Sequence, residues 1–156
     1  MERDIEYITM AIELAKQGVF PYGTVIVKDG KVIGKASSGD GDSYDPTGHA
    51  ETLAVRNACK NMNTSNLDGA TIYSSCEPCF MCFGSIWWSN ISRIVYGANI
   101  YDSNNILNTD INITIEELNE KTGNHINITG GILKDEAVSV MKNWKEKITI
   151  SEGVKL

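Results

Sequence analysis

The sequence lacks any long apolar run. Over its 156 residues, no stretch approaches the roughly 20 consecutive apolar residues that a membrane-spanning helix needs. Its first residues, MERDIEYITM, are polar and charged and do not show the basic and apolar segments of a secretory signal. We therefore expect a cytoplasmic protein that does not associate with membranes.

Basic residues are also in short supply. Lys and Arg total 14 against 20 Asp and Glu, which gives a net charge of −6. Such a field repels phosphate backbones, whereas proteins that bind them tightly concentrate Lys and Arg. This balance argues against nucleic acid as a partner.

Cysteines are few but clustered. Three of the four, Cys76, Cys79 and Cys82, fall within one heptapeptide. In a reducing compartment, this clustering favours metal binding or redox chemistry over disulfide bonds. We expect Cys59 to be a packing residue.

Apolar periodicity and turn residues predict helices that alternate with strands along the chain. The expected helices cover residues 4–17, 47–62, a stretch starting at Pro78, 114–120 and 133–147. The expected strands form a hairpin within 22–36 around Asp29-Gly30, then cover 70–75, 93–98 and 125–129, and the polar, Asn-rich residues 99–113 stay unassigned. This order predicts one α/β domain over residues 1–156, with a mixed five-stranded sheet and about five helices.

His49, Cys79 and Cys82 have the chemistry of a zinc site. The two cysteines are three apart, which places them on one helix face, and the positive helix N-terminus favours their thiolate forms. An imidazole from the helix near His49 would complete a set of three ligands. A catalytic zinc keeps its fourth position for water, so we expect one Zn²⁺ per subunit.

Glu51, two residues after His49, can carry protons beside such a zinc ion. The hydrolytic deamination of a nucleobase needs a carrier of this kind, because a ring nitrogen of the base must be protonated for water to attack and the departing amine must be protonated to leave. His-x-Glu followed by Pro-Cys-x-x-Cys is the signature of zinc-dependent base deaminases, in which the glutamate is not a metal ligand. A closed structural zinc site would need a fourth Cys or His, and a redox pair would leave Glu51 without a role.

Four stretches around these residues resemble the cytidine deaminase-like superfamily, and within it the branch of guanine deaminases and tRNA adenosine deaminases. These are PYGTVIVKDG, DPTGHAE, SCEPCFMCFGSIWW and ISRIVYGA, while the later GGILKDEA is similar to tRNA adenosine deaminases. The resemblance implies a three-layer α/β/α fold, zinc at His49, Cys79 and Cys82, a proton shuttle at Glu51, and homodimers.

The resemblance also suggests the substrate. Trp87 and Trp88 resemble the aromatic-Trp pair of guanine deaminases, and Asp110 falls near an acidic residue that contacts their substrate. Ser38 stands where the family has a substrate-binding Asn. The candidate substrate contacts are Asp110, Ser38, Trp88 and Pro78, and the expected substrate is a free aminated nucleobase, guanine or a related aminopurine.

Several alternatives stay open. Ser38, together with the lack of the terminal aromatic residue that closes the pocket in guanine deaminases, leaves room for a cytosine-type or modified-base deaminase. A tRNA adenosine deaminase and a zinc module without turnover are further alternatives. The two tryptophans are equally suited to core packing or a dimer contact, Asp110 to a turn, and we expect Cys76 and His125 to be structural.

Overall fold

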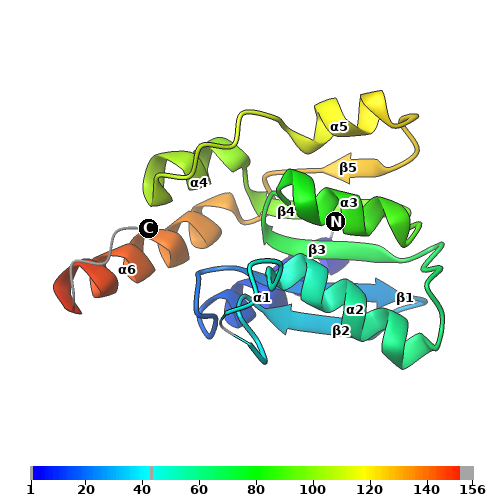
Figure 1. Cartoon of the computed structure of the whole chain (residues 1–156), viewed down its shortest axis with the longest axis horizontal. Helices are drawn as coiled ribbons and strands as arrows, with labels where there is room; N and C mark the ends of the chain where they lie inside the picture. The colour runs from blue at the N-terminus through cyan, green and yellow to red at the C-terminus, as the bar shows by residue number, and fades with distance from the viewer. Residues whose placement is uncertain (1, 43, 152–156) are drawn as a thin grey trace.

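The computed structural model describes residues 2–42 and 44–151, without the side chains of residues 150 and 151. Its elements are α1 (Glu2–Ala15), β1 (Gly23–Lys28), β2 (Lys31–Ser37), α2 (Ala50–Met62), β3 (Thr71–Cys76), α3 (Phe80–Trp88), β4 (Arg93–Ala98), α4 (Ile100–Leu107), α5 (Ile115–Lys121), β5 (Asn127–Thr129) and α6 (Lys134–Ser151). The strands form one sheet in the order β2-β1-β3-β4-β5 (Figure 1). β1 pairs antiparallel with β2 and β3, whereas the β3–β4 and β4–β5 pairs are parallel.

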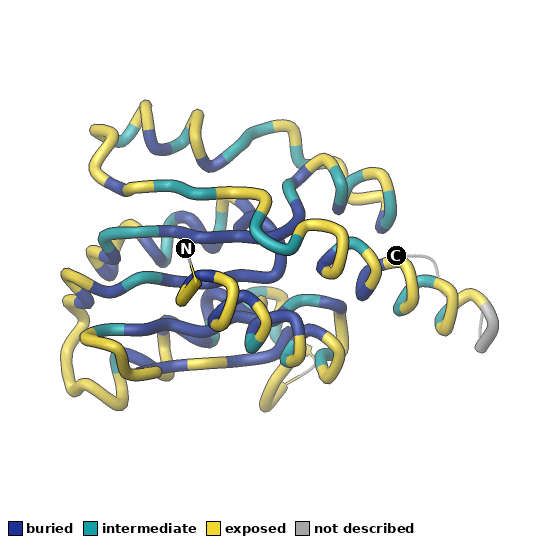
Figure 2. Tube along the Cα trace, turned by 180° about the vertical axis from the view of Figure 1, so that it is seen from behind, coloured by how far each residue is buried: buried dark blue, intermediate teal, exposed yellow. Residues whose placement is uncertain are grey.

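Helices cover both faces of this sheet because its central strands are apolar on both sides. Successive strand side chains point to opposite faces, so Ile26 joins a core with α2 and α3 while Val25 and Val27 join a second core with α1 and α6. Figure 2 shows the buried residues concentrated in the central strands. The predicted three-layer α/β/α arrangement with a mixed five-stranded sheet is confirmed.

The predicted hairpin is present. Asp29 and Gly30 have φ values of 50° and 72°, the left-handed backbone of a two-residue turn whose twist matches the flanking strands. The turn pairs Lys28 with Lys31 and fixes the register of β1 against β2.

Two features of the secondary structure differ from the expectation. The unassigned Asn-rich stretch contains α4, so the described residues hold six helices rather than five. A reciprocal capping box between Asn99 and Asp102 opens α4, each side chain accepting the other's backbone N–H at 2.9 Å. The strand expected over 125–129 is only three residues long because the Asn119 side chain binds both the N–H and the carbonyl of Ile126.

The helix boundaries differ from the predicted ones by up to four residues. The first helix is two residues earlier than expected at both ends. α2 begins at Ala50 and α3 at Phe80, so His49 and Cys79 are N-cap residues rather than members of the first turn. α6 continues to Ser151, and residues 152–156 lie outside the described residues.

An ion pair between a buried Asp4 and a partly exposed Arg93 attaches α1 to the sheet. The Arg93 guanidinium donates to both Asp4 carboxylate oxygens at 2.8 Å, and the Tyr73 hydroxyl donates to Oδ1 at 3.0 Å. These contacts, the Arg93 hydrogen bonds first, hold the pKa of Asp4 below its usual range. The pair joins residues 89 positions apart in the sequence.

We expect Asp4→Asn to lower the free energy of unfolding by about 1–3 kcal/mol at pH 7, the range for hydrogen bonds to charged groups and buried partners. Because the pKa of Asp4 is lowered in the folded state, its contribution is fully present above the ordinary value of 3.8 and is lost as the pH falls through the folded value. Urea titrations of both proteins from pH 7 to pH 3 measure the difference. A difference that does not shrink on acidification would contradict this origin.

Candidate metal centre and active site

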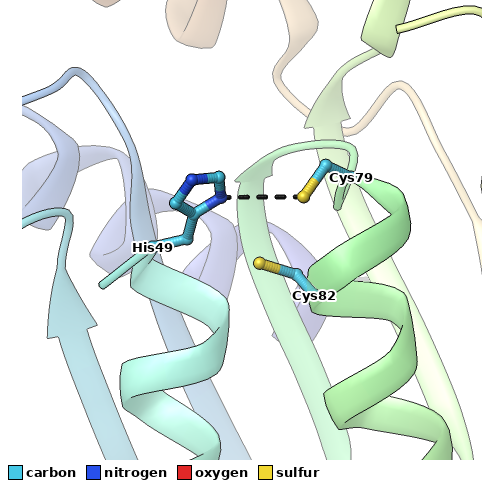
Figure 3. A group of neighbouring side chains, drawn as sticks. All are labelled: His49, Cys79 and Cys82. Carbon is cyan, nitrogen blue, oxygen red and sulfur yellow. Dashed lines mark hydrogen bonds between the residues drawn. The ribbon is translucent and has the colours of Figure 1, made fainter. Parts of the chain in front are cut away.

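The site forms where the N-termini of two neighbouring helices meet. α2 and α3 pack against each other on one face of the sheet, and their N-cap residues are His49 and Cys79. Both N-caps have extended backbone and make no side-chain capping hydrogen bond, so the imidazole and the thiol are directed toward each other instead (Figure 3). Cys82, one turn into α3, points into the same space.

The three side chains fit a zinc ion. The ligand atoms of His49, Cys79 and Cys82 all lie within 4.8 Å of one another. Among the described residues, these three side chains form a group that could hold a metal ion. His49 Nδ1 lies 3.6 Å from Cys79 Sγ, and a tetrahedral zinc with ordinary bond lengths places nitrogen and sulfur about 3.6 Å apart. One nitrogen and two sulfurs leave one position for water, which is the ligand set of a catalytic zinc.

The surroundings favour the ionised form of the Cys79 thiol. The hydrogen bond from Cys82 and the contact with His49 lower the pKa of Cys79 to about 4. The Cys79 contact in turn raises the pKa of His49. The Thr52 hydroxyl donates to Cys82 Sγ at 3.3 Å and orients the second sulfur.

Glu51 lies in the first turn of α2 and is only 5% exposed. The Ser74 hydroxyl donates to Glu51 Oε1 at 2.7 Å and fixes the carboxyl group from below. Burial, followed by the negative charge of Cys79, raises the pKa of Glu51. A carboxyl group with a raised pKa exchanges protons readily near neutral pH.

A cavity of about 320 Å³ opens over these groups. His49, Glu51 and Cys79 line it, together with apolar side chains from the loop before β1 and from the segment around α4. The apolar lining residues from those two segments are Phe20, Ile100, Leu107 and Ile111. The arrangement suits a flat heterocycle held over a metal and a proton carrier.

The candidate substrate contacts are not all in this cavity. Ser38 lines it and is 3% exposed. Trp88 lies on α3 outside the lining residues and is 80% exposed, and Pro78, although buried in the loop before α3, is not a lining residue either. Asp110 is exposed and accepts a hydrogen bond from Asn112 at 3.0 Å.

The orientation of Asp110 follows from its neighbours. The Asn104 side chain binds the Ile111 backbone N–H and carbonyl and accepts from the Thr109 hydroxyl. Thr109 and Ile111 consequently line the cavity, and Asp110 between them does not.

Glu77 is a structural residue that the sequence did not reveal. Its two carboxylate oxygens accept the backbone N–H groups of Ile100 and Ile115, the first residues of α4 and α5, at 2.8 and 3.0 Å. Burial raises the pKa of Glu77, while these two hydrogen bonds oppose the rise. One side chain, two positions before Cys79, thus fixes the starts of two helices, of which α4 contributes residues to the cavity wall.

Known proteins share this arrangement. Residues 1–98 match the family described as the cytidine and deoxycytidylate deaminase zinc-binding region. Because the match covers more than half of the chain, the chain belongs to this family. The expected family membership and zinc cofactor are confirmed.

Two kinds of relative stand out. The chain is 42% identical over 97 residues to the guanine deaminase of Bacillus subtilis (strain 168), a match that spans 62% of each protein. It is 33% identical over 152 residues to the tRNA-specific adenosine deaminase of Haemophilus influenzae (strain ATCC 51907 / DSM 11121 / KW20 / Rd), spanning 94% of this chain and 85% of that protein.

The fold has a solved counterpart as well. A guanine deaminase structure from Nitrosomonas europaea superposes with a TM-score of 0.78 at 21% identity, covering 91% of this chain and 84% of that one. None of the helices that the structure describes combines the length and apolar character needed to cross a bilayer.

We expect purified protein to contain about one zinc ion per chain, measured by inductively coupled plasma mass spectrometry. His49→Ala and Cys82→Ser each remove a ligand and should lower the zinc content to well below one ion per chain. Cys76→Ser is the matched control, because Cys76 is equally buried but lies at the end of β3 outside the ligand set. Zinc loss in the control together with zinc retention in Cys82→Ser would show that the ligands are assigned wrongly.

Proposed function

We propose that the protein hydrolyses the exocyclic amine of a free aminopurine, guanine or a close relative, and releases ammonia. The observation that carries the proposal is the buried carboxyl group of Glu51, which lines the same cavity as two of the three metal-binding side chains, His49 and Cys79. In the reaction, the oxygen of water bonds to the ring carbon, the C–N bond breaks, and the amine leaves as ammonia.

Zinc held by His49, Cys79 and Cys82 would lower the pKa of a bound water molecule to near neutrality. The residues of the chain do the rest. Glu51 accepts one proton from the attacking water and passes it to a ring nitrogen, and then takes the remaining proton of that water from the hydroxyl group on the ring carbon and delivers it to the departing amine. Ser74 holds one Glu51 oxygen by its 2.7 Å hydrogen bond, and a base seated against the apolar part of the cavity wall would displace water from the reacting groups.

The size and charge of the site favour a free base over a polymer. Small-molecule pockets span about 300–1,000 Å³, and a cavity of about 320 Å³ lies at the small end of that range. The net charge of −6 disfavours a large anionic partner. The 42% identity to a guanine deaminase supports a purine.

A tRNA adenosine deaminase is the second candidate. Its support is the length of the similarity, because the Haemophilus influenzae relative matches 94% of this chain, whereas the guanine deaminase matches 62%.

Ser38 in the cavity wall also keeps a cytosine-type or modified base open as substrate. Its hydroxyl makes no hydrogen bond within the described part of the chain, so it is free to bind a ligand.

Ammonia release from the zinc-loaded protein tests the proposal with guanine, other aminopurines, cytosine, their nucleosides and tRNA. We expect turnover of guanine or a related free aminopurine, and a reduction of kcat by about 10²–10⁴ in Glu51→Gln with unchanged zinc content. Glu116→Gln, which changes an exposed glutamate on α5, is the matched control. Activity on tRNA alone, accompanied by a salt-sensitive gel shift, would overturn the proposal in favour of the second candidate.

We also propose that the protein is a homodimer in which α3 contributes to the interface. α3 exposes three large apolar side chains, Phe80 at 57%, Trp87 at 38% and Trp88 at 80%. The two indole rings lie edge to face with centroids 5.0 Å apart. Exposed aromatic residues are typical of protein interfaces.

Sedimentation equilibrium should give twice the chain mass for the unmodified protein. Trp88→Ser should raise the dissociation constant of the dimer at least tenfold, because a central aromatic contact contributes about 2 kcal/mol or more. Tyr101→Ser removes an aromatic residue that is 51% exposed on α4 and serves as the control. A monomer at all concentrations would refute the proposed dimer, and a dimer unaffected by Trp88→Ser would move the interface away from α3.

A further inference from the structure

The cavity wall contains a pair of hydroxyl groups that the reaction above does not use. Tyr22, just before β1, and Ser103, on α4, lie 81 residues apart in the sequence. Their hydroxyl oxygens are 2.7 Å apart, a strong hydrogen bond in which either oxygen can be the donor. Both residues line the same cavity as His49 and Glu51.

Counting hydrogens shows that this pair is incomplete. Two hydroxyl groups bring two hydrogens, and one hydrogen bond between them uses one. Within residues 2–42 and 44–151, neither hydroxyl has another hydrogen-bond partner. Whichever group donates within the pair, one hydrogen remains for a molecule in the cavity.

The surroundings make this remaining donor consequential. Ser103 is only 3% exposed, and its neighbours in the cavity wall include Ile100 and Leu107. In such an apolar setting, a hydrogen bond to a ligand is stronger than in water, and an unpaired donor is costly. A site of this kind discriminates strongly against ligands that lack the matching acceptor.

We propose that the Tyr22–Ser103 pair is a specificity-determining contact that donates a hydrogen bond to an acceptor atom of a heterocyclic substrate, a ring nitrogen or a carbonyl oxygen. The inference rests on the proposed function and narrows its substrate class to bases that present such an acceptor to this wall. The pair also connects the start of β1 with α4. A purely structural connection would affect stability and all ligands alike.

The test is a matrix of binding measurements that crosses one substitution with single-atom changes in the ligand. Tyr22→Phe removes the hydroxyl and keeps the ring. The ligands are guanine and three analogues. 3-Deazaguanine and 7-deazaguanine each lack one ring nitrogen of guanine, and 2-aminopurine lacks its carbonyl oxygen. Dissociation constants are measured by calorimetry in the zinc-loaded, full-length Glu51→Gln background, so that turnover does not interfere.

We expect Tyr22→Phe to weaken guanine binding about 3- to 10-fold, the usual effect of one net hydrogen bond. For one of the three analogues the substitution should have no effect, because that analogue already lacks the acceptor; this non-additivity identifies the contacted atom. Ser103→Ala should weaken guanine binding in the same direction. Tyr7→Phe is the matched control, since the Tyr7 hydroxyl contacts the Gly30 carbonyl on α1's side of the sheet and does not line the cavity.

Equal weakening of all four ligands, no weakening of any, or failure of all four to bind would overturn the inference. Ammonia release by the unsubstituted protein tests the proposed function separately. Turnover of guanine without dependence of binding on Tyr22 rejects the inference alone. If ligand binding depends selectively on Tyr22 but no ammonia is released, the Tyr22–Ser103 contact is supported and the proposed deaminase function is rejected.

Discussion

The convergence of two helix N-termini is the constraint on which this site depends. α2 and α3 lie on the same face of the sheet, and each begins with a residue whose side chain caps nothing in its own helix. His49 and Cys79 are therefore free to face each other across the gap (Figure 3). Both helix dipoles direct their positive ends at this point, which favours the thiolate form of Cys79. Metal affinity thus arises from the packing of two helices rather than from a dedicated loop.

Charge balance explains why a cation belongs at this point. Cys79, Cys82 and Glu51 bring three acidic groups into a small and largely buried volume, where like charges disfavour one another's ionisation. The mutual effect is visible in the raised pKa of Glu51, to which the charge of Cys79 contributes after burial. A divalent cation held by the two sulfurs compensates this charge. The same cation therefore stabilises the ligands and lets the carboxyl group exchange protons beside them.

The sequence predicted the parts of the molecule that depend on local patterns. Apolar periodicity, the Asp29-Gly30 turn and the spacing of His49, Cys79 and Cys82 were sufficient for the sheet, the layers and a group of three side chains that can hold a metal ion. The misses depend on single side chains binding distant or irregular backbone. α4 is opened by a capping box in a segment of weak helix formers, and β5 is shortened by Asn119. The roles of the candidate substrate contacts, the single-domain organisation and the cytoplasmic location stay predictions.

Glu77 shows how the cavity wall formed by α4 is positioned relative to the metal-binding side chains. Its carboxylate binds main-chain N–H groups of Ile100 and Ile115, which any residue except proline supplies. The starts of α4 and α5 are thus positioned relative to Cys79 without using their own side chains. Side chains farther along α4, among them Ser103, then project into the cavity from a fixed origin. We therefore expect substitutions of α4 side chains in this wall to leave the zinc ligands and Glu51 in place, because Glu77 holds the start of α4 through a main-chain N–H group.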